Sequence, residues 1–230
     1  MWIKICGNTN LEDAALAAEL GADAVGFVFA ASRRQVTAAE VAAITPRLPE
    51  GLERVGVFDT HDADEIAAVA QEAGLTAVQL HGGLDEGLLE QLVERFAGGI
   101  RVIQVLHWLV DDTAAPAVDP PAPWLVRQVE QIAQRGFADR VLIDSKVGGA
   151  TGGTGVSFNW AAARAMFATA PVGLRLILAG GLTPENVGAA ISELHPWGVD
   201  VSSGVEASPG RKDPARMAKF IANARKTKAP

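Results

Sequence analysis

The chain has 230 residues, of which 49 % are apolar and 20 % charged, a balance typical of a protein with a sizeable buried core. Acidic residues outnumber basic ones by 27 to 20, and the net charge of −7 disfavours binding to nucleic acid or to an anionic membrane surface. The single cysteine excludes an internal disulfide, and the first residues enter a strand pattern without a signal peptide, so a cytoplasmic location is predicted. No apolar run is long enough to cross a bilayer, so no membrane partner is expected.

Short apolar runs alternate with longer amphipathic segments along the chain. Such runs, bounded by glycine, proline or polar residues, predict eight strands. The predicted strands cover Trp2–Ile5, Ala24–Phe29, Arg54–Phe58, Ala77–Leu80, Arg101–Leu106, Arg140–Ile143, Leu174–Leu178 and Val199–Val201. Helices are predicted between them at about 10–20, 38–44, 62–73, 85–96, 124–135 and 159–168, from Thr183 onward, and at 213–226. Thr183 is expected to be the N-cap of the seventh helix, with Pro184 in its first turn.

Eight strand–helix units in a chain of 230 residues predict an α/β protein, a single-domain (β/α)8 barrel (TIM barrel) over residues 1–230. A doubly wound open sheet is the alternative. Its dinucleotide-binding glycine pattern is missing after the first strand, where Cys6-Gly7-Asn8 stands instead. The proline-rich segment at about 110–123 is expected to be an insertion and not a domain boundary.

Catalytic side chains of such barrels lie at the carboxyl ends of the strands, and several reactive residues fall there. Asp144 ends the sixth predicted strand and precedes a loop of five glycines, two of which, Gly153 and Gly155, are candidate substrate-binding residues. Cys6 ends the first strand and shares a face with Lys4, and a nearby ammonium group can lower the pKa of a thiol. The alternatives are a helix-capping aspartate and a buried, inert cysteine; the positions favour an acid and a base that act together.

His81 and His107 also follow strands, and each fits either a substrate contact or a hydrogen-bonded residue on the rim of the site. The four histidines show no metal-ligand spacing, so no metal ion is predicted. Asp59 ends the third strand at the same face of the barrel.

The last quarter of the chain predicts a phosphate site. Gly180 and Gly181 follow the seventh strand, and Ser202, Ser203 and Gly204 follow the eighth. Barrels often bind phosphate through the backbone amides of these two loops, and small residues let the oxygens approach closely. Tight turns are the alternative explanation of the glycines.

Segments spread over nearly the whole chain resemble the phosphoribosylanthranilate isomerase family. The matching segments are Lys4-Ile5-Cys6-Gly7, 21–29, 55–58, Val78-Gln79-Leu80-His81-Gly82, 142–155, 178–187 and 200–206. The resemblance implies an Amadori rearrangement of N-(5'-phosphoribosyl)anthranilate in tryptophan biosynthesis. Asp144 would be the general acid, Cys6 the general base, and Arg34 would bind the anthranilate carboxylate. The reaction implies no cofactor.

The chain departs from the family pattern at two places, and other functions stay open. No proline stands at 31–33, and Val156-Ser157-Phe158-Asn159 replaces a common Lys-Thr-Phe-Asp. An isomerase of another phosphoribosylamine, such as the histidine-pathway intermediate, usually carries aspartate where Cys6 stands. A catalytically silent phosphate-sugar binder would have lost the acid or the base. Both a monomer and a homodimer are compatible with the sequence.

Overall fold

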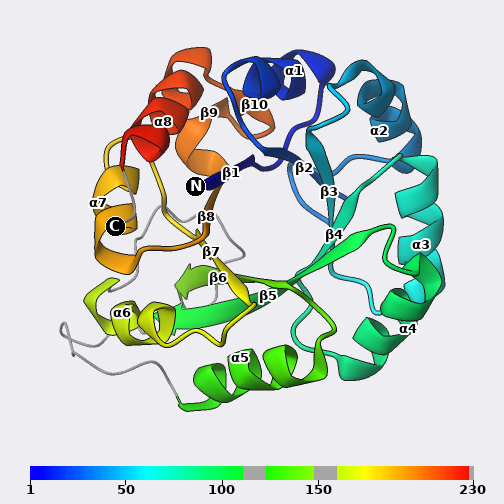
Figure 1. The fold of residues 1–230 in the computed structure, drawn as a ribbon. Coiled ribbons are helices and arrows are strands. Elements are labelled where there is room, and N and C mark those ends of the chain that lie inside the picture. Colours follow the sequence, from blue (N-terminus) through cyan, green and yellow to red (C-terminus); the bar gives the residue numbers. More distant parts are fainter. Residues whose placement is uncertain (111–122, 148–159, 228–230) are drawn as a thin grey trace.

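The computed structural model describes residues 1–110, 123–147 and 160–227 (Figure 1). Within them eight parallel strands close into a barrel in sequence order, because β8 pairs with β1 (Figure 1). The strands are β1 Trp2–Ile5, β2 Ala24–Val28, β3 Glu53–Phe58, β4 Ala77–Leu80, β5 Arg101–Val110, β6 Arg140–Val147, β7 Arg175–Ala179 and β8 Gly198–Val201. The predicted (β/α)8 barrel is therefore confirmed.

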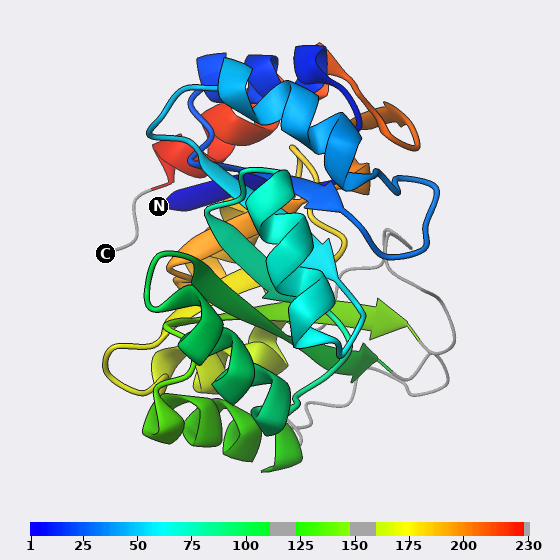
Figure 2. The same ribbon diagram turned by 90° about the vertical axis from the view of Figure 1, so that its right-hand side faces the viewer.

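The helices form a ring outside the strands (Figures 1 and 2). They are α1 Leu11–Glu19, α2 Ala38–Ile44, α3 Ala63–Glu72, α4 Glu86–Phe96, α5 Pro123–Arg135, α6 Trp160–Ala168, α7 Val187–Leu194 and α8 Pro214–Lys226. Among the N-cap residues that the structure describes, five have a side chain that accepts a hydrogen bond from a backbone N–H of the first turn, namely Asn10, Thr37, Asp62, Asp85 and Asp213. Among the described residues, no helix combines the length and apolar character needed to span a membrane.

Strand side chains alternate between the barrel interior and the helix layer. The larger apolar cluster lies between strands and helices, and a smaller one, which includes Val55, Ile103 and Leu142, fills the interior. Trp2 stacks on Trp197 with ring centroids 5.4 Å apart, near the amino ends of the strands.

Two strands are longer than predicted. β5 and β6 stay paired in register from Ile103↔Arg140 to Val110↔Val147, so His107 and Asp144 face each other inside the strands and not at their ends. The cross-strand hydrogen bonds extend both strands beyond their apolar runs. The expected insertion between 110 and 123 and the loop with Gly153 and Gly155 lie outside the described residues, apart from Val110 and Pro123 themselves.

The predicted cap of the seventh helix is wrong. α7 begins after Asn186, whose side chain accepts from the Thr183 N–H and donates to the Gly181 carbonyl, so residues 183–186 form a turn that precedes the helix. Three short elements were also not predicted: the 3-10 helices η1 Thr45–Arg47 and η2 Ser203–Val205, and the hairpin of β9 Glu206–Ser208 with β10 Arg211–Lys212.

Candidate active site

A cavity of about 500 Å³ opens at the carboxyl end of the barrel. Its wall brings together all the predicted site residues that the structure describes. They are Cys6, Arg34, His81, Asp144, Gly180, Gly181, Ser202, Ser203 and Gly204. Asp59 lines the same cavity, whereas Gly153 and Gly155 lie outside the described residues.

The thiol of Cys6 is buried beside the ammonium group of Lys4, with which it forms a hydrogen bond. The Lys4 side chain is fully buried, and its Nζ lies 3.0 Å from Oδ1 of Asp200, the residue opposite Lys4 on β8. Gly26 on β2 makes room for this contact, because a Cβ there would lie 2.8 Å from the Cys6 Sγ and 2.9 Å from the Lys4 Cε. The three groups thus form a compact buried cluster at the base of the cavity.

Burial raises the pKa of the Cys6 thiol above its ordinary value, although the Lys4 ammonium opposes this rise. The Lys4 ammonium thus acts in the direction that the sequence suggests, but desolvation outweighs it and the net pKa of Cys6 is raised. Burial alone would lower the pKa of Lys4, but Asp200 and Cys6 outweigh it and raise that pKa. Lys4 consequently stays charged. Its ammonium group favours the thiolate of Cys6, whereas burial favours the neutral thiol.

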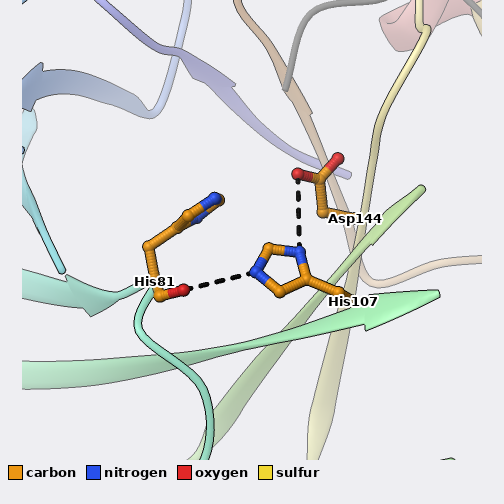
Figure 3. A group of neighbouring side chains, drawn as sticks. All are labelled: His81, His107 and Asp144. Atoms are coloured by element: carbon orange, nitrogen blue, oxygen red, sulfur yellow. Dashed lines mark hydrogen bonds and ion pairs between the residues drawn. The ribbon is translucent and has the colours of Figure 1, made fainter. Parts of the chain in front are cut away.

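Asp144 lines the same cavity as Cys6 and lies beside two histidines (Figure 3). Nδ1 of His107 is 4.0 Å from Oδ2 of Asp144, and Nε2 of His107 is 3.2 Å from the backbone carbonyl oxygen of His81 (Figure 3). The His81 and His107 rings meet edge to face with centroids 4.6 Å apart. All three side chains are partly buried.

His81, His107 and Asp144 also form a group that could hold a metal ion, since one potential ligand atom of each lies within 4.8 Å of the others. Two histidines and a carboxylate are a known metal-binding combination. The same geometry also suits a proton shared between His107 and Asp144.

The loops after β7 and β8 touch each other. Gly180 and Gly181 have φ values of 88° and 62°, in the region that favours glycine. A Cβ on Gly204 would lie 1.9 Å from the Leu182 carbonyl oxygen, so only glycine allows the second loop to pack this closely on the first. The short helix η2 begins at Ser203, in the loop that follows β8. The close packing brings the backbones of both loops to one wall of the cavity, as a phosphate site requires.

Arg34 occupies the loop after β2 and is clamped by Glu206. Its Nε and Nη2 donate to the two carboxylate oxygens at 2.8 and 2.7 Å. This contact raises the pKa of Arg34. Burial alone would raise the pKa of Glu206, but Arg34 and Lys212 outweigh it and lower that pKa. A guanidinium group has five N–H groups, so a substrate carboxylate can bind at another of its edges.

The Lys212 side chain links the Arg34–Glu206 pair to the backbone of Cys6, the residue that follows β1. Its buried Nζ lies 3.1 Å from Glu206 and donates to the backbone carbonyls of Cys6 and Ser202. Sequence reasoning missed Asp200, Glu206 and Lys212 as site residues. Asp200 and Glu206 fall in a segment that carries the family resemblance, whereas Lys212 gave no signal because it sits on a strand of only two residues.

A (β/α)8 barrel with a cavity at the carboxyl ends of its strands is typical of a class of proteins, the barrel enzymes. The family model described as N-(5'phosphoribosyl)anthranilate (PRA) isomerase matches residues 3–223. A protein of Pelobacter propionicus named N-(5'-phosphoribosyl)anthranilate isomerase is 41 % identical over 230 residues, which cover 99 % of this chain and 97 % of the relative. The chain belongs to the phosphoribosylanthranilate isomerase family, the isomerases of tryptophan biosynthesis, which confirms the resemblance found in the sequence.

Solved structures agree. The crystal structure of phosphoribosyl anthranilate isomerase from Thermotoga maritima matches with a TM-score of 0.79 at 36 % identity, covering 98 % of this chain and 99 % of that one. A structure of the isomerase in complex with reduced 1-(o-carboxyphenylamino)-1-deoxyribulose 5-phosphate matches with a TM-score of 0.77 at the same 36 % identity and with coverage of 98 % and 99 %.

Replacing Gly204 by alanine is predicted to weaken both phosphate binding and folding. The new methyl group overlaps the Leu182 carbonyl and forces the two loops apart, at a cost of about 1–3 kcal/mol. Urea unfolding and the Kd for inorganic phosphate measure the two effects. Gly51→Ala is the matched control, because nothing lies within 4 Å of a Cβ at Gly51. Equal phosphate affinity in Gly204→Ala and Gly51→Ala would contradict the phosphate assignment.

Replacing Lys4 by methionine, together with Asp200→Asn to avoid a buried unpaired charge, is predicted to raise the pKa of Cys6 further. Burial of the thiol persists in this variant while the opposing ammonium is gone. The chain has one cysteine and no tyrosine, so the alkaline change in ultraviolet absorbance reports the Cys6 thiolate without tyrosinate background. Cys6→Ala supplies the baseline. Asp200 also raises the pKa of Cys6, so the reference is Asp200→Asn alone; a titration midpoint unchanged or lower than in that variant would show that Lys4 does not stabilise the thiolate.

Proposed function

We propose that the protein converts N-(5'-phosphoribosyl)anthranilate to 1-(2-carboxyphenylamino)-1-deoxyribulose 5-phosphate by an Amadori rearrangement. The observation that carries the proposal is that one cavity holds a thiol beside a buried ammonium group, a carboxylate beside two histidines, and two touching loops of small residues. These are the base, the acid and the phosphate anchor that the rearrangement needs.

The first step opens the ribose ring. Asp144 in its protonated form donates to the ring oxygen, the bond from C1 to that oxygen breaks, and the anilino nitrogen lone pair forms the C1=N bond. In the second step the Cys6 thiolate removes the proton from C2, and the electrons of the C–H bond move toward C1=N to give the enolamine. The enolamine then gains a proton at C1 and loses the proton of its C2 hydroxyl, which leaves the ketone.

Each turnover therefore leaves one proton on Cys6 and removes one from Asp144, and solvent exchange restores both groups. Overall the substrate gains two protons, at the ring oxygen and at C1, and loses two, from C2 and from the C2 hydroxyl, so the product is an isomer. No electrons are transferred to an outside acceptor, and we accordingly propose that no cofactor and no metal take part.

Substrate binding is assigned to the remaining residues of the cavity wall. The phosphate binds the loops that contain Gly180, Gly181, Ser202, Ser203 and Gly204. Arg34 binds the anthranilate carboxylate, with Glu206 fixing the orientation of the guanidinium group. His81 lines the wall beside Asp144, and roles for Gly153 and Gly155 stay predictions from the sequence.

The partner in this proposal is thus a small phosphoribosyl compound, and neither nucleic acid nor a membrane. The cytoplasm is the proposed location, since the single cysteine acts as a reduced thiol. A monomer and a homodimer fit the proposal equally, because every assigned residue comes from one chain.

Removing the acid or the base is predicted to abolish turnover without unfolding the protein. Cys6→Ala and Asp144→Ala should each lower kcat by about 10²–10⁴-fold, the usual contribution of general acid–base catalysis. The assay follows the loss of anthranilate-type fluorescence from freshly made phosphoribosylanthranilate, corrected for spontaneous breakdown.

Inorganic phosphate binding is the control, since neither substitution touches the phosphate loops. Wild-type turnover in either variant would overturn the mechanism, and absent turnover in the wild-type protein would overturn the substrate assignment.

A further inference from the structure

His107 lies behind the proposed acid on the neighbouring strand. β5 and β6 place His107 directly opposite Asp144 in the parallel ladder, and their side chains emerge on the same side (Figure 3). Nδ1 of His107 faces Oδ2 of Asp144 at 4.0 Å. The strand pairing fixes this approach, so it does not depend on the conformation of a loop.

The other ring nitrogen fixes the tautomer of His107. Nε2 lies 3.2 Å from the carbonyl oxygen of His81. A carbonyl oxygen can only accept a hydrogen bond, so Nε2 must carry the hydrogen. Neutral His107 therefore presents a lone pair at Nδ1 toward Asp144.

A lone pair and a carboxylate repel each other, so the two groups can bond only through an added proton. That proton sits either on the Asp144 carboxyl, which then donates to Nδ1, or on Nδ1, which then donates to the carboxylate. In either form Asp144 and Nδ1 of His107 share one proton. The hydrogen bond between them favours the state that holds this proton over the state that lacks it.

We propose that His107 is a positioning residue for Asp144, holding through its Nδ1 the proton that Asp144 delivers to the ribose ring oxygen. This inference rests on the proposed role of Asp144 as general acid. The 4.0 Å gap closes to hydrogen-bond length when substrate fills the cavity, as catalytic hydrogen bonds commonly tighten on binding. When the proton passes to the ring oxygen, the C1–O bond breaks, Asp144 is left as carboxylate and His107 as neutral imidazole. Solvent then returns one proton to the pair.

Other titratable or charged side chains line the same cavity as Asp144. In the described part of the chain they are Cys6, Arg33, Arg34, Asp59, His81 and Asp200, with Lys4 buried beside Cys6 and Asp200. Substitutions at His107 leave all of these in place. A change in pH dependence that appears in His107 variants and requires Asp144 is therefore assigned to the pair.

Three variants of His107 separate its two nitrogens. Asn places its amide oxygen where Nδ1 lies and can accept from Asp144. Gln places its amide nitrogen near Nε2, so it keeps the bond to the His81 carbonyl but offers nothing at Nδ1. Phe keeps only the ring shape. For each variant kcat, KM and the pH dependence of kcat are measured with EDTA present, and circular dichroism and thermal unfolding check the fold.

The expected result is a kcat loss of about tenfold to hundredfold in His107→Gln and His107→Phe, a part of the full general acid–base contribution. Their KM should change little, and the high-pH limb of kcat should move to lower pH, because the acid loses its proton sooner. His107→Asn should retain the most activity. In an Asp144→Asn background, His107→Gln should cause no further loss, because His107 acts through Asp144.

Wild-type kcat and pH dependence in His107→Gln would overturn the inference, as would an effect confined to KM. Loss of wild-type activity in EDTA, restored by zinc, would make the three residues a metal site and overturn it as well. Full activity in Asp144→Asn would instead remove the general acid itself, so failure of the proposed mechanism is distinguishable from failure of the role of His107.

Discussion

The buried ammonium group of Lys4 is the constraint on which the rest of the site depends. A charged group in a barrel interior needs an opposite charge at close range, which Asp200 supplies at 3.0 Å, and the Cys6 thiol adds a hydrogen bond. Lys4 and Asp200 lie on β1 and β8, the strands whose pairing closes the barrel, and Cys6 directly follows β1. The pairing that closes the barrel thus also brings Asp200 to Lys4, which lies beside the Cys6 thiol. Gly26, on β2 at the other edge of β1, must lack a side chain, because a Cβ there would contact both Lys4 and Cys6.

Two further networks hold the cavity around this centre. Glu206 and Lys212 connect the Arg34 guanidinium to the backbone of Cys6 and Ser202, so one network holds the proposed base and the proposed carboxylate-binding residue. The extended pairing of β5 and β6 brings His107 to Asp144, the proposed acid. The cations Lys4 and Lys212 oppose the rise that burial causes in the pKa of Cys6, whereas Asp144 lies beside imidazoles. Cys6 and Asp144 thus have different surroundings, as a proposed base and a proposed acid require.

The alternation of short apolar runs with amphipathic segments was enough to predict the barrel, because each strand is buried on both faces and each helix on one. Strand order then placed Cys6, Asp144 and the two phosphate loops at one end. The sequence could not show that β5 and β6 pair beyond their apolar residues, since their last backbone hydrogen bonds leave no hydrophobic pattern. Nor could it show the roles of Lys212 and Asn186, because their contacts are set by a two-residue strand and a local turn. Nor could the sequence show the net direction of the Cys6 pKa, because desolvation depends on how deeply the fold buries the thiol.

The most direct test of this account is a crystal structure of the protein with reduced 1-(2-carboxyphenylamino)-1-deoxyribulose 5-phosphate bound. The account predicts the phosphate against the Gly180–Gly181 and Ser202–Gly204 loops, the carboxylate on Arg34, and C2 of the sugar chain next to the Cys6 thiol. The oxygen on C4, which derives from the ribose ring oxygen, should face Asp144. A complex with C2 turned away from Cys6, or with the phosphate outside the two loops, would contradict the assignment of the base and the orientation of the substrate.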